Sequence, residues 1–379
     1  MDFELTKKQE MFRTLFQEFA EKEVAPKAFE IDENGEFPWD TVKKMGKLGF
    51  LGLPFTKEYG GAGADTLTYI MAVEEISRAC AATGVILSAH VSLGCHPIYQ
   101  FGTPQQKEKY LVPMAKGELL GAFGLTEPNA GTDAAGQQTA AVLDGDAYIL
   151  NGTKIFITNG GCADVYIVFA MTDPAKGLKG ISAFIVEKGT PGFTFGPKEH
   201  KMGIRASSTT ELIFQDCRIP KENLLGKEGD GFKIAMQTLD GGRIGIAAQA
   251  LGIAQAALDE CVRYTKERQQ FNKPLSNFQA IQWMIADMAT DIDAARFLVY
   301  RAAVLKDKKK PFSKEAAMAK LFASEAAMKH TVKAVQIHGG YGYMKEYKVE
   351  RLMRDAKITE IYEGTSEVQR MVIAGNTLK

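Results

Sequence analysis

The 379-residue sequence lacks the features of several common protein classes. No uninterrupted apolar stretch reaches the roughly 18 to 20 residues that a membrane-spanning helix requires. Neither sign of charge is in excess, because 46 Lys and Arg balance 46 Asp and Glu. Extended binding to nucleic acid or to an anionic membrane therefore has little electrostatic support, and we expect neither partner.

Cysteine is scarce, and the local motifs of well-known catalytic classes are missing. The five cysteines are scattered without a C-x-x-C pair, and the five histidines show no metal-ligand spacing, so we expect no disulfide framework and no metal site. No G-x-G-x-x-G, G-x-x-x-x-G-K-[ST], H-E-x-x-H or G-x-S-x-G motif occurs. The N-terminus carries acid before any cation, unlike a secretory or transit peptide, which predicts a cytoplasmic protein.

The hydrophobic period divides the sequence into three parts. In residues 1–120, hydrophobic residues recur about every 3.6 positions, which predicts an N-terminal helical domain. Residues 121–225 show a period of two with many turn dipeptides, which predicts a middle β domain, a barrel or a sandwich. The helical period returns over residues 226–379 and predicts a C-terminal domain like a four-helix bundle. The expected fold class is α+β with several domains.

Local signals support this division. Thr6 and Gln9 are spaced as a capping box ahead of an apolar stripe, and residues 103–106 combine an N-cap threonine, a proline and a glutamine in the same way. In the middle part, Asn151-Gly152 suits a type I′ turn, so residues 147–158 are expected to form a β-hairpin.

Three polar, glycine-rich segments stand out: Phe123–Asp133, Gln336–Tyr343 and Ile361–Gln369. Taken singly, they suit a tight turn, the C-terminal cap of a helix and the N-terminal cap of another helix. In this order and spacing, they resemble the acyl-CoA dehydrogenase family of flavoenzymes, and the resemblance covers essentially the whole chain. Phe156–Asn159 and Asp240–Arg243 are most similar to the short-chain, butyryl-CoA dehydrogenases of bacteria.

The resemblance implies FAD as cofactor, an acyl-CoA substrate, electron-transferring flavoprotein as electron acceptor, and a homotetramer. Glu363 is the implied base for the α-proton, while FAD accepts the β-hydrogen as hydride. The flavin ring and its chain would contact Phe123, Leu125, Thr126, Phe156, Ile157, Thr158, Thr365 and Glu367. The diphosphate and adenosine, bound across a subunit interface, would contact Arg268, Phe271, Gln336, Ile337, Gly339 and Gly340. The implied acyl-CoA contacts are Thr132, Asp240, Arg243 and Gly364.

Two further features bear on the reaction. Some relatives take their base from the helix around Asp240–Arg243, where this sequence has Gly242, so Glu363 is the candidate that remains. The stretch Gly84–Ile98, expected to line the acyl tail, contains no Lys or Arg, which favours a neutral acyl chain. The resemblance to short-chain dehydrogenases implies a chain of four carbons as first choice. The alternatives are a dehydrogenase of the same fold for branched-chain, aromatic or other acyl-CoA, an oxygen-using acyl-CoA oxidase, and a non-catalytic, flavin-free scaffold.

Overall fold

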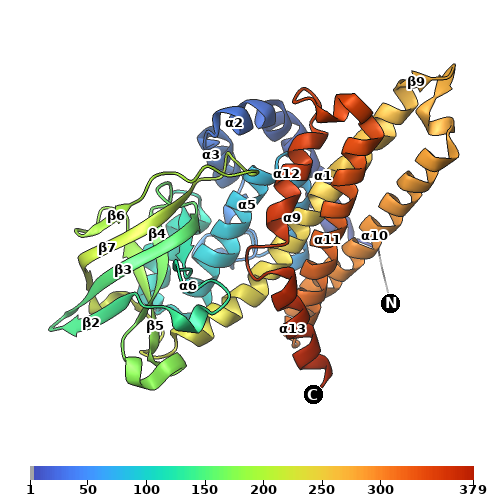
Figure 1. Ribbon diagram of the computed structural model, residues 1–379. Coiled ribbons are helices and arrows are strands. Elements are labelled where there is room, and N and C mark those ends of the chain that lie inside the picture. The colour runs from blue at the N-terminus through green and yellow to red at the C-terminus, as the bar shows by residue number, and fades with distance from the viewer. Residues whose placement is uncertain (1–3) are drawn as a thin grey trace.

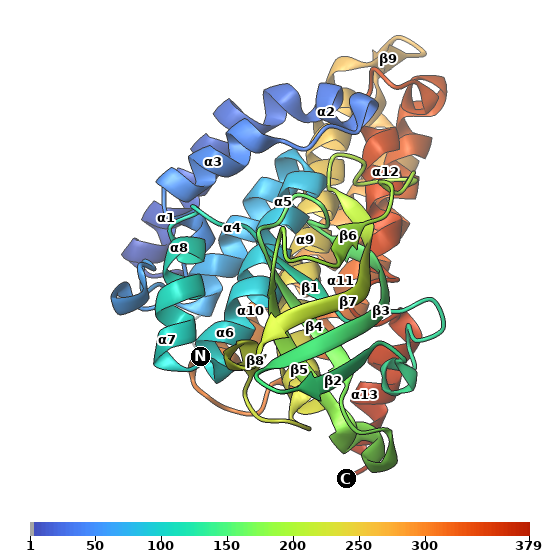
Figure 2. The same ribbon diagram turned by 90° about the vertical axis from the view of Figure 1, so that its left-hand side faces the viewer.

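The computed structural model describes residues 4–379 and confirms the expected three-part α+β architecture (Figure 1). A β-sheet domain lies on one side of a bundle of long helices, and the N-terminal helices pack beside both. Figure 2 shows the sheet in front of the long helices, with the N-terminal helices along one flank.

The N-terminal part consists of short helices around two buried ones. Thr6 and Gln9 form the predicted capping box, and Thr103 and Gln106 form the second. The α-helices are α1 (Lys7–Phe19), α2 (Ala28–Asn34), α3 (Trp39–Lys47), α4 (Thr66–Ala79), α5 (Ala81–Ser88), α6 (His96–Phe101), α7 (Pro104–Gln106) and α8 (Val112–Ala115), with π-helical turns at Ala20–Val24, Ala89–Cys95 and Lys107–Leu111.

One helical run is long and apolar enough to cross a membrane by composition. It extends over Ala81–Phe101, and 94% of its most apolar window is buried inside the protein. This run packs against α9 and the first strand of the sheet, as a core helix does.

The middle part is a mixed sheet of eight strands in the order β6-β7-β3-β2-β4-β5-β8, with β1 parallel to β4. The short strand β1 follows directly on the N-terminal helices and brings the chain into the sheet. The strands are β1 (Gly121–Gly124), β2 (Ala140–Asp144), β3 (Ala147–Thr158), β4 (Val165–Met171), β5 (Ile181–Glu187), β6 (Phe193–Phe195), β7 (Thr209–Pro220) and β8 (Leu224–Leu225).

The expected hairpin turn at Asn151-Gly152 is wrong. Residues 147–158 form the single strand β3, and the turn falls earlier, at Gly145-Asp146, because β2 supplies the neighbouring strand. Asn151 lies at an irregularity in the pairing of β3 with β7, where its side chain exchanges two hydrogen bonds with Asp216. A Cβ on Gly152 would approach a neighbouring side chain to 2.6 Å, so this glycine serves close packing and not a turn.

The C-terminal part is built on three long helices, α9 (Gly231–Glu267), α10 (Gln279–Asp307) and α11 (Ser313–His338). Small buried residues such as Ala316, Ala319 and Ala323 let α11 lie close to its neighbours. A two-stranded hairpin, β9 (Gln269–Gln270) and β10 (Lys273–Pro274), joins α9 to α10, and α12 (Val349–Thr359) and α13 (Ser366–Thr377) complete the domain.

A buried histidine joins the helical part to the sheet. The backbone N–H of Gly121, the first residue of β1, donates to His90 Nδ1 at 3.0 Å, so that nitrogen carries no proton. His90 Nε2 lies 3.1 Å from the carbonyl oxygen of Met114 in α8 and donates to it. Burial lowers the pKa of His90 to about 4, so the ring is neutral near pH 7.

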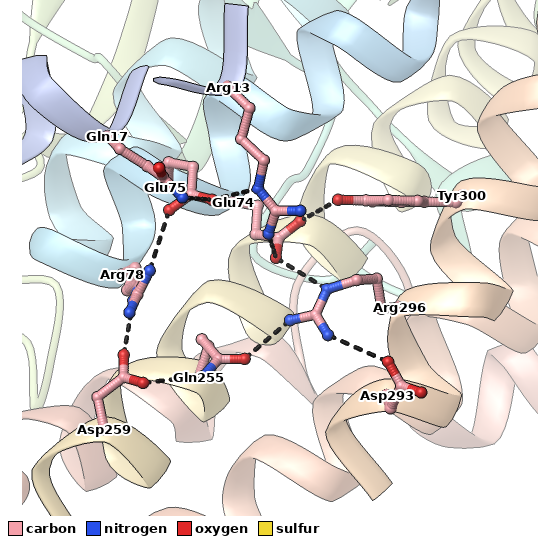
Figure 3. A network of polar contacts seen from close by, with 10 residues as sticks. All are labelled: Arg13, Gln17, Glu74, Glu75, Arg78, Gln255, Asp259, Asp293, Arg296 and Tyr300. Carbon is pink, nitrogen blue, oxygen red and sulfur yellow. Dashed lines mark hydrogen bonds and ion pairs between the residues drawn. The ribbon is translucent and has the colours of Figure 1, made fainter. Parts of the chain in front are cut away.

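A network of polar contacts around the buried Glu74 and Glu75 fixes α4 against α1, α9 and α10 (Figure 3). Glu75 accepts from Arg13 Nε at 2.9 Å, while Glu74 accepts from Arg296 Nε at 3.2 Å and from the Tyr300 hydroxyl at 2.9 Å. Burial raises the pKa of Glu74, and the nearby Arg296 opposes that effect. The network continues through Gln17, Arg78, Gln255, Asp259 and Asp293.

Candidate active site

A cavity of about 200 Å³ lies where the three parts of the chain meet. The sheet, α9, the α5 region and the turn before α13 all contribute to its wall. The predicted site residues that line it are Phe123, Leu125, Thr126, Thr132, Phe156, Ile157, Thr158, Arg243, Glu363 and Gly364.

Three other predicted residues, Asp240, Thr365 and Glu367, do not line this cavity, but each is next to a lining residue in the sequence. Asp240 accepts from Arg243 Nη1 at 2.6 Å and from the Ser313 hydroxyl at 2.9 Å, so Arg243 is held as one half of an ion pair. Thr365 is the N-cap of α13, and Glu367 is exposed in the first turn of that helix. Within residues 4–379, Arg243 Nε is buried without a hydrogen-bond partner.

Four of the six remaining predicted residues line a second, more open depression of about 590 Å³. Arg268, Ile337, Gly339 and Gly340 line it, with the Arg268 guanidinium 5.3 Å from the ring centroid of Tyr341. Gln336 precedes this group at the end of α11, and Phe271 is 87% exposed beside the β9 hairpin. Figure 1 places that hairpin at the opposite end of the bundle from α13, so a single chain does not bring the two groups together.

Glu363 lies in the turn between α12 and α13 and presents its carboxyl group to the first cavity. It has a φ of 51°, and Gly364 follows with a φ of 94°, so the turn uses two consecutive left-handed residues. Glu363 Oε2 is buried and has no hydrogen-bond partner within residues 4–379. Burial raises the pKa of Glu363 to about 7, against the opposing charges of Lys320 and Arg243. An unpartnered carboxyl with a pKa near neutrality is suited to accept a proton.

Gly242 on α9 leaves the space that this carboxyl occupies. A Cβ at position 242 would lie 2.1 Å from Glu363 Oε2 and 3.1 Å from Leu93 Cδ2. The sequence shows the missing side chain at 242, but only the fold shows that this point of α9 faces the candidate base.

We predict that Gly242→Ala lowers the rate of substrate oxidation by about 10- to 100-fold, because the added methyl displaces the Glu363 carboxyl from its position. The measurement is the rate at which substrate bleaches the visible band of the flavin that the family resemblance implies. Gly241→Ala is the matched control, since its Cβ would meet only the flexible end of Lys306, with Nζ at 2.9 Å. Equal rates in the two variants would contradict the prediction.

The sheet presents Phe156 to the cavity through a backbone irregularity. The pairing of β3 with β7 shifts between Lys154 and Ile157, and Phe156 has a φ of 58°. Beneath this point, the fully buried Lys154 donates to Glu127 Oε1 at 2.7 Å and to the Leu125 carbonyl at 3.1 Å. Lys154 therefore ties β3 to the loop that carries the predicted flavin contacts.

Sequence reasoning missed three charged residues at the site. Lys154, Glu127 and Lys320 are each buried beside predicted site residues. A charged residue normally indicates a solvent-exposed position, so the pattern gave no sign of their burial, although Glu127 lies in the segment Phe123–Asp133 that stood out in the sequence.

Comparison with known proteins identifies the family. Family models described as the N-terminal, middle and C-terminal domains of acyl-CoA dehydrogenase match residues 6–118, 122–217 and 229–378. The chain belongs to the acyl-CoA dehydrogenase family. It is an oxidoreductase, and its cofactor is FAD.

Similar proteins are known from several bacteria. The chain is 63% identical to the short-chain-specific acyl-CoA dehydrogenase of Clostridium acetobutylicum over the full length of both. The solved butyryl-CoA dehydrogenase of Megasphaera elsdenii is 59% identical with a TM-score of 0.99, and all of both chains is covered. A chain solved in work on the electron transferring flavoprotein of Acidaminococcus fermentans and flavin-based electron bifurcation is 61% identical, again with a TM-score of 0.99 and full coverage of both chains.

The residues present fit a flavin dinucleotide. The first cavity combines apolar side chains such as Leu125 and Phe156 with the hydroxyls of Thr126 and Thr158, a combination that suits a flat ring with a polar edge. In the second depression, a Cβ on Gly339 or Gly340 would meet nothing within 4 Å, so open space lies beside the backbone there.

Proposed function

We propose that this enzyme oxidises short-chain acyl-CoA thioesters, butyryl-CoA first, to the α,β-unsaturated products. Bound FAD would supply the acceptor for the β-hydrogen, which leaves with two electrons as hydride. Glu363 accepts the α-proton at its carboxylate, so that the loss of one proton and one hydride leaves the new carbon–carbon double bond. The observation that carries this proposal is the Glu363 carboxyl group, which lines the cavity and whose Oε2 is buried without a hydrogen-bond partner among residues 4–379.

The residues around the base support this assignment. The backbone N–H of Glu363 is the implied donor to the thioester carbonyl, which would acidify the α-carbon. Gly364 has no side chain to obstruct a thioester beside that turn. Thr132 and Arg243 line the same cavity and are the proposed acyl-CoA contacts, with Asp240 holding Arg243 in place.

A small, uncharged acyl chain suits the inner wall of the cavity. Val85, Ala89 and Leu93 form this wall, and all three are apolar and buried. The charge of Arg243, the cation in the cavity lining, is already paired with Asp240, so it is not free for a distal carboxylate on the substrate. The names of the similar proteins agree with short chains.

We infer that electrons leave through electron-transferring flavoprotein and that the enzyme is a cytoplasmic homotetramer. The similarity to the chain from the work on the Acidaminococcus flavoprotein supports that acceptor. The two separated groups of predicted FAD contacts support binding of each FAD by two subunits. Under this proposal, Arg268, Phe271, Gln336, Ile337, Gly339 and Gly340 complete the neighbour's cofactor site.

The test is anaerobic mixing of the purified holoenzyme with butyryl-CoA while the visible flavin band is recorded. We expect rapid bleaching, and slower bleaching with branched-chain and aromatic thioesters. A yellow enzyme that bleaches only with those thioesters would contradict the short-chain assignment. Reoxidation of the bleached enzyme by oxygen as fast as by electron-transferring flavoprotein would identify an oxidase instead.

A further inference from the structure

A buried lysine on α11 holds the turn that carries the candidate base. The Lys320 side chain is fully buried, and its Nζ donates to the carbonyl oxygen of Gly364 at 2.7 Å. Gln369 Nε2, from α13, donates to the same oxygen at 2.8 Å. One carbonyl next to Glu363 therefore receives two side-chain donors from two helices, one charged and one neutral.

The ammonium of Lys320 has no carboxylate within ion-pair distance in the described part of the chain. The other cation near Glu363, Arg243, is paired with Asp240 at 2.6 Å. Burying an ammonium group without a direct counterion is costly, so its position next to the base calls for a role that an apolar side chain would not fill.

The charged and titratable groups around the base come from several elements. Lys320 and Arg243 act on Glu363 from α11 and α9. The phenols of Tyr69 and Tyr362 also face it, and burial raises the pKa of both, so they are uncharged near neutrality. Besides Glu363, the carboxylates that act on Lys320 are Glu360 and Glu367.

We propose that Lys320 is a positioning residue for the base: its ammonium fixes the Gly364 carbonyl, and with it the Glu363 turn, and supplies positive charge that favours the ionised carboxylate. This inference rests on the proposed role of Glu363 as base.

Glu363 and Lys320 each oppose the effect that burial has on the pKa of the other. Burial raises the pKa of Glu363 to about 7, and Lys320 is the largest influence opposing that rise. Burial lowers the pKa of Lys320 to about 8, and Glu363 is the largest influence opposing that fall. Each charge favours the charged form of the other group, and the ionised form of Glu363 is the one that can take a proton. Loss of the lysine charge therefore raises the pKa of Glu363 and moves the onset of activity to higher pH.

The experiment compares pH profiles of flavin bleaching by butyryl-CoA in four holoenzymes, from about pH 5 to 9. The acid limb is the part of the profile in which the rate rises with pH as Glu363 loses its proton. In Lys320→Met, we expect this limb to move to higher pH by about one unit or more, because Glu363 loses a nearby opposite charge. In Lys320→Arg, which keeps the charge, the limb should stay near that of the unaltered enzyme. Gln369→Met is the matched control: it removes the neutral donor to the same carbonyl, so the rate falls while the limb does not move.

A second readout does not depend on turnover. Infrared difference spectra recorded during a pH titration follow the protonated carboxyl of Glu363, and its band is identified by its absence in Glu363→Gln. The midpoint of this band should rise in Lys320→Met by the same amount as the kinetic limb.

Several outcomes would overturn the role of Lys320. One is a pH profile of Lys320→Met that superimposes on that of the unaltered enzyme. Another is an acid limb in Gln369→Met that moves as far as the one in Lys320→Met. If Lys320→Met does not fold, Lys320→Gln replaces it; failure of both to fold, with normal folding of Lys320→Arg, would assign the lysine to stability alone. Unchanged turnover in Glu363→Gln would instead refute the base itself, whatever the Lys320 variants show.

Discussion

Replacing Glu363 with glutamine is expected to slow butyryl-CoA oxidation by about 10²- to 10⁴-fold, the range that a positioned general base contributes. The amide has nearly the shape of the carboxyl group but cannot accept the α-proton. The cavity wall stays intact, so the variant should still be yellow and still bind a thioester. The checks are the rate of anaerobic flavin bleaching and the spectral change on adding the unsaturated product.

The control for this variant is Glu30→Gln, the same chemical change at an exposed position of α2. It should leave the rate unchanged. A Glu363→Gln enzyme that bleaches at nearly the normal rate would show that another group removes the proton. The unaltered enzyme should also gain activity as pH rises through about 7, because Glu363 must lose its own proton before it can act.

Lys154→Met is expected to lower the free energy of unfolding by about 3–5 kcal/mol, the usual effect of breaking a buried ion pair. The change leaves the carboxylate of Glu127 buried without its counterion and removes the donor to the Leu125 carbonyl and to Gln137 Oε1. Denaturant unfolding followed by circular dichroism measures the effect through the transition midpoint and slope.

Two comparisons locate the origin of this loss. Lys154→Met combined with Glu127→Gln removes both charges and should be less destabilised than Lys154→Met alone. Lys22→Met breaks an ion pair with Glu18 whose side chains are 70% and 58% exposed, and should change stability by less than about 0.5 kcal/mol. Equal losses of unfolding free energy in Lys154→Met and Lys22→Met would show that the buried ion pair stabilises the fold no more than the exposed one.

Local sequence signals predicted helix ends correctly where the hydrogen bonds that form them join residues close together in the sequence. The capping boxes at Thr6 and Thr103 depend on residues three positions apart, and both are present. The turn expected at Asn151-Gly152 failed because the strand before residue 147 and the partner β7 decide the pairing there. Turn propensity is a local preference that sheet pairing can override.

The candidate site was predictable to a different degree for different residues. The cavity-lining residues around Phe156 and Glu363 came from a family resemblance and lie together in the structure. The burial of Lys154 and Lys320 depends on partners 27 and 44 positions away in the sequence. No periodic pattern contains that information.

The contact between Gly242 and Glu363 also has an evolutionary consequence. A side chain at 242 and a carboxyl at 363 compete for the same volume, since a Cβ at 242 would begin 2.1 Å from Glu363 Oε2. The two positions cannot drift independently: a larger residue at one is tolerated once the other has become smaller. A lineage with this fold can therefore move its base between the turn before α13 and the facing point of α9 by a pair of compensating substitutions, while the proton is still taken in the same volume.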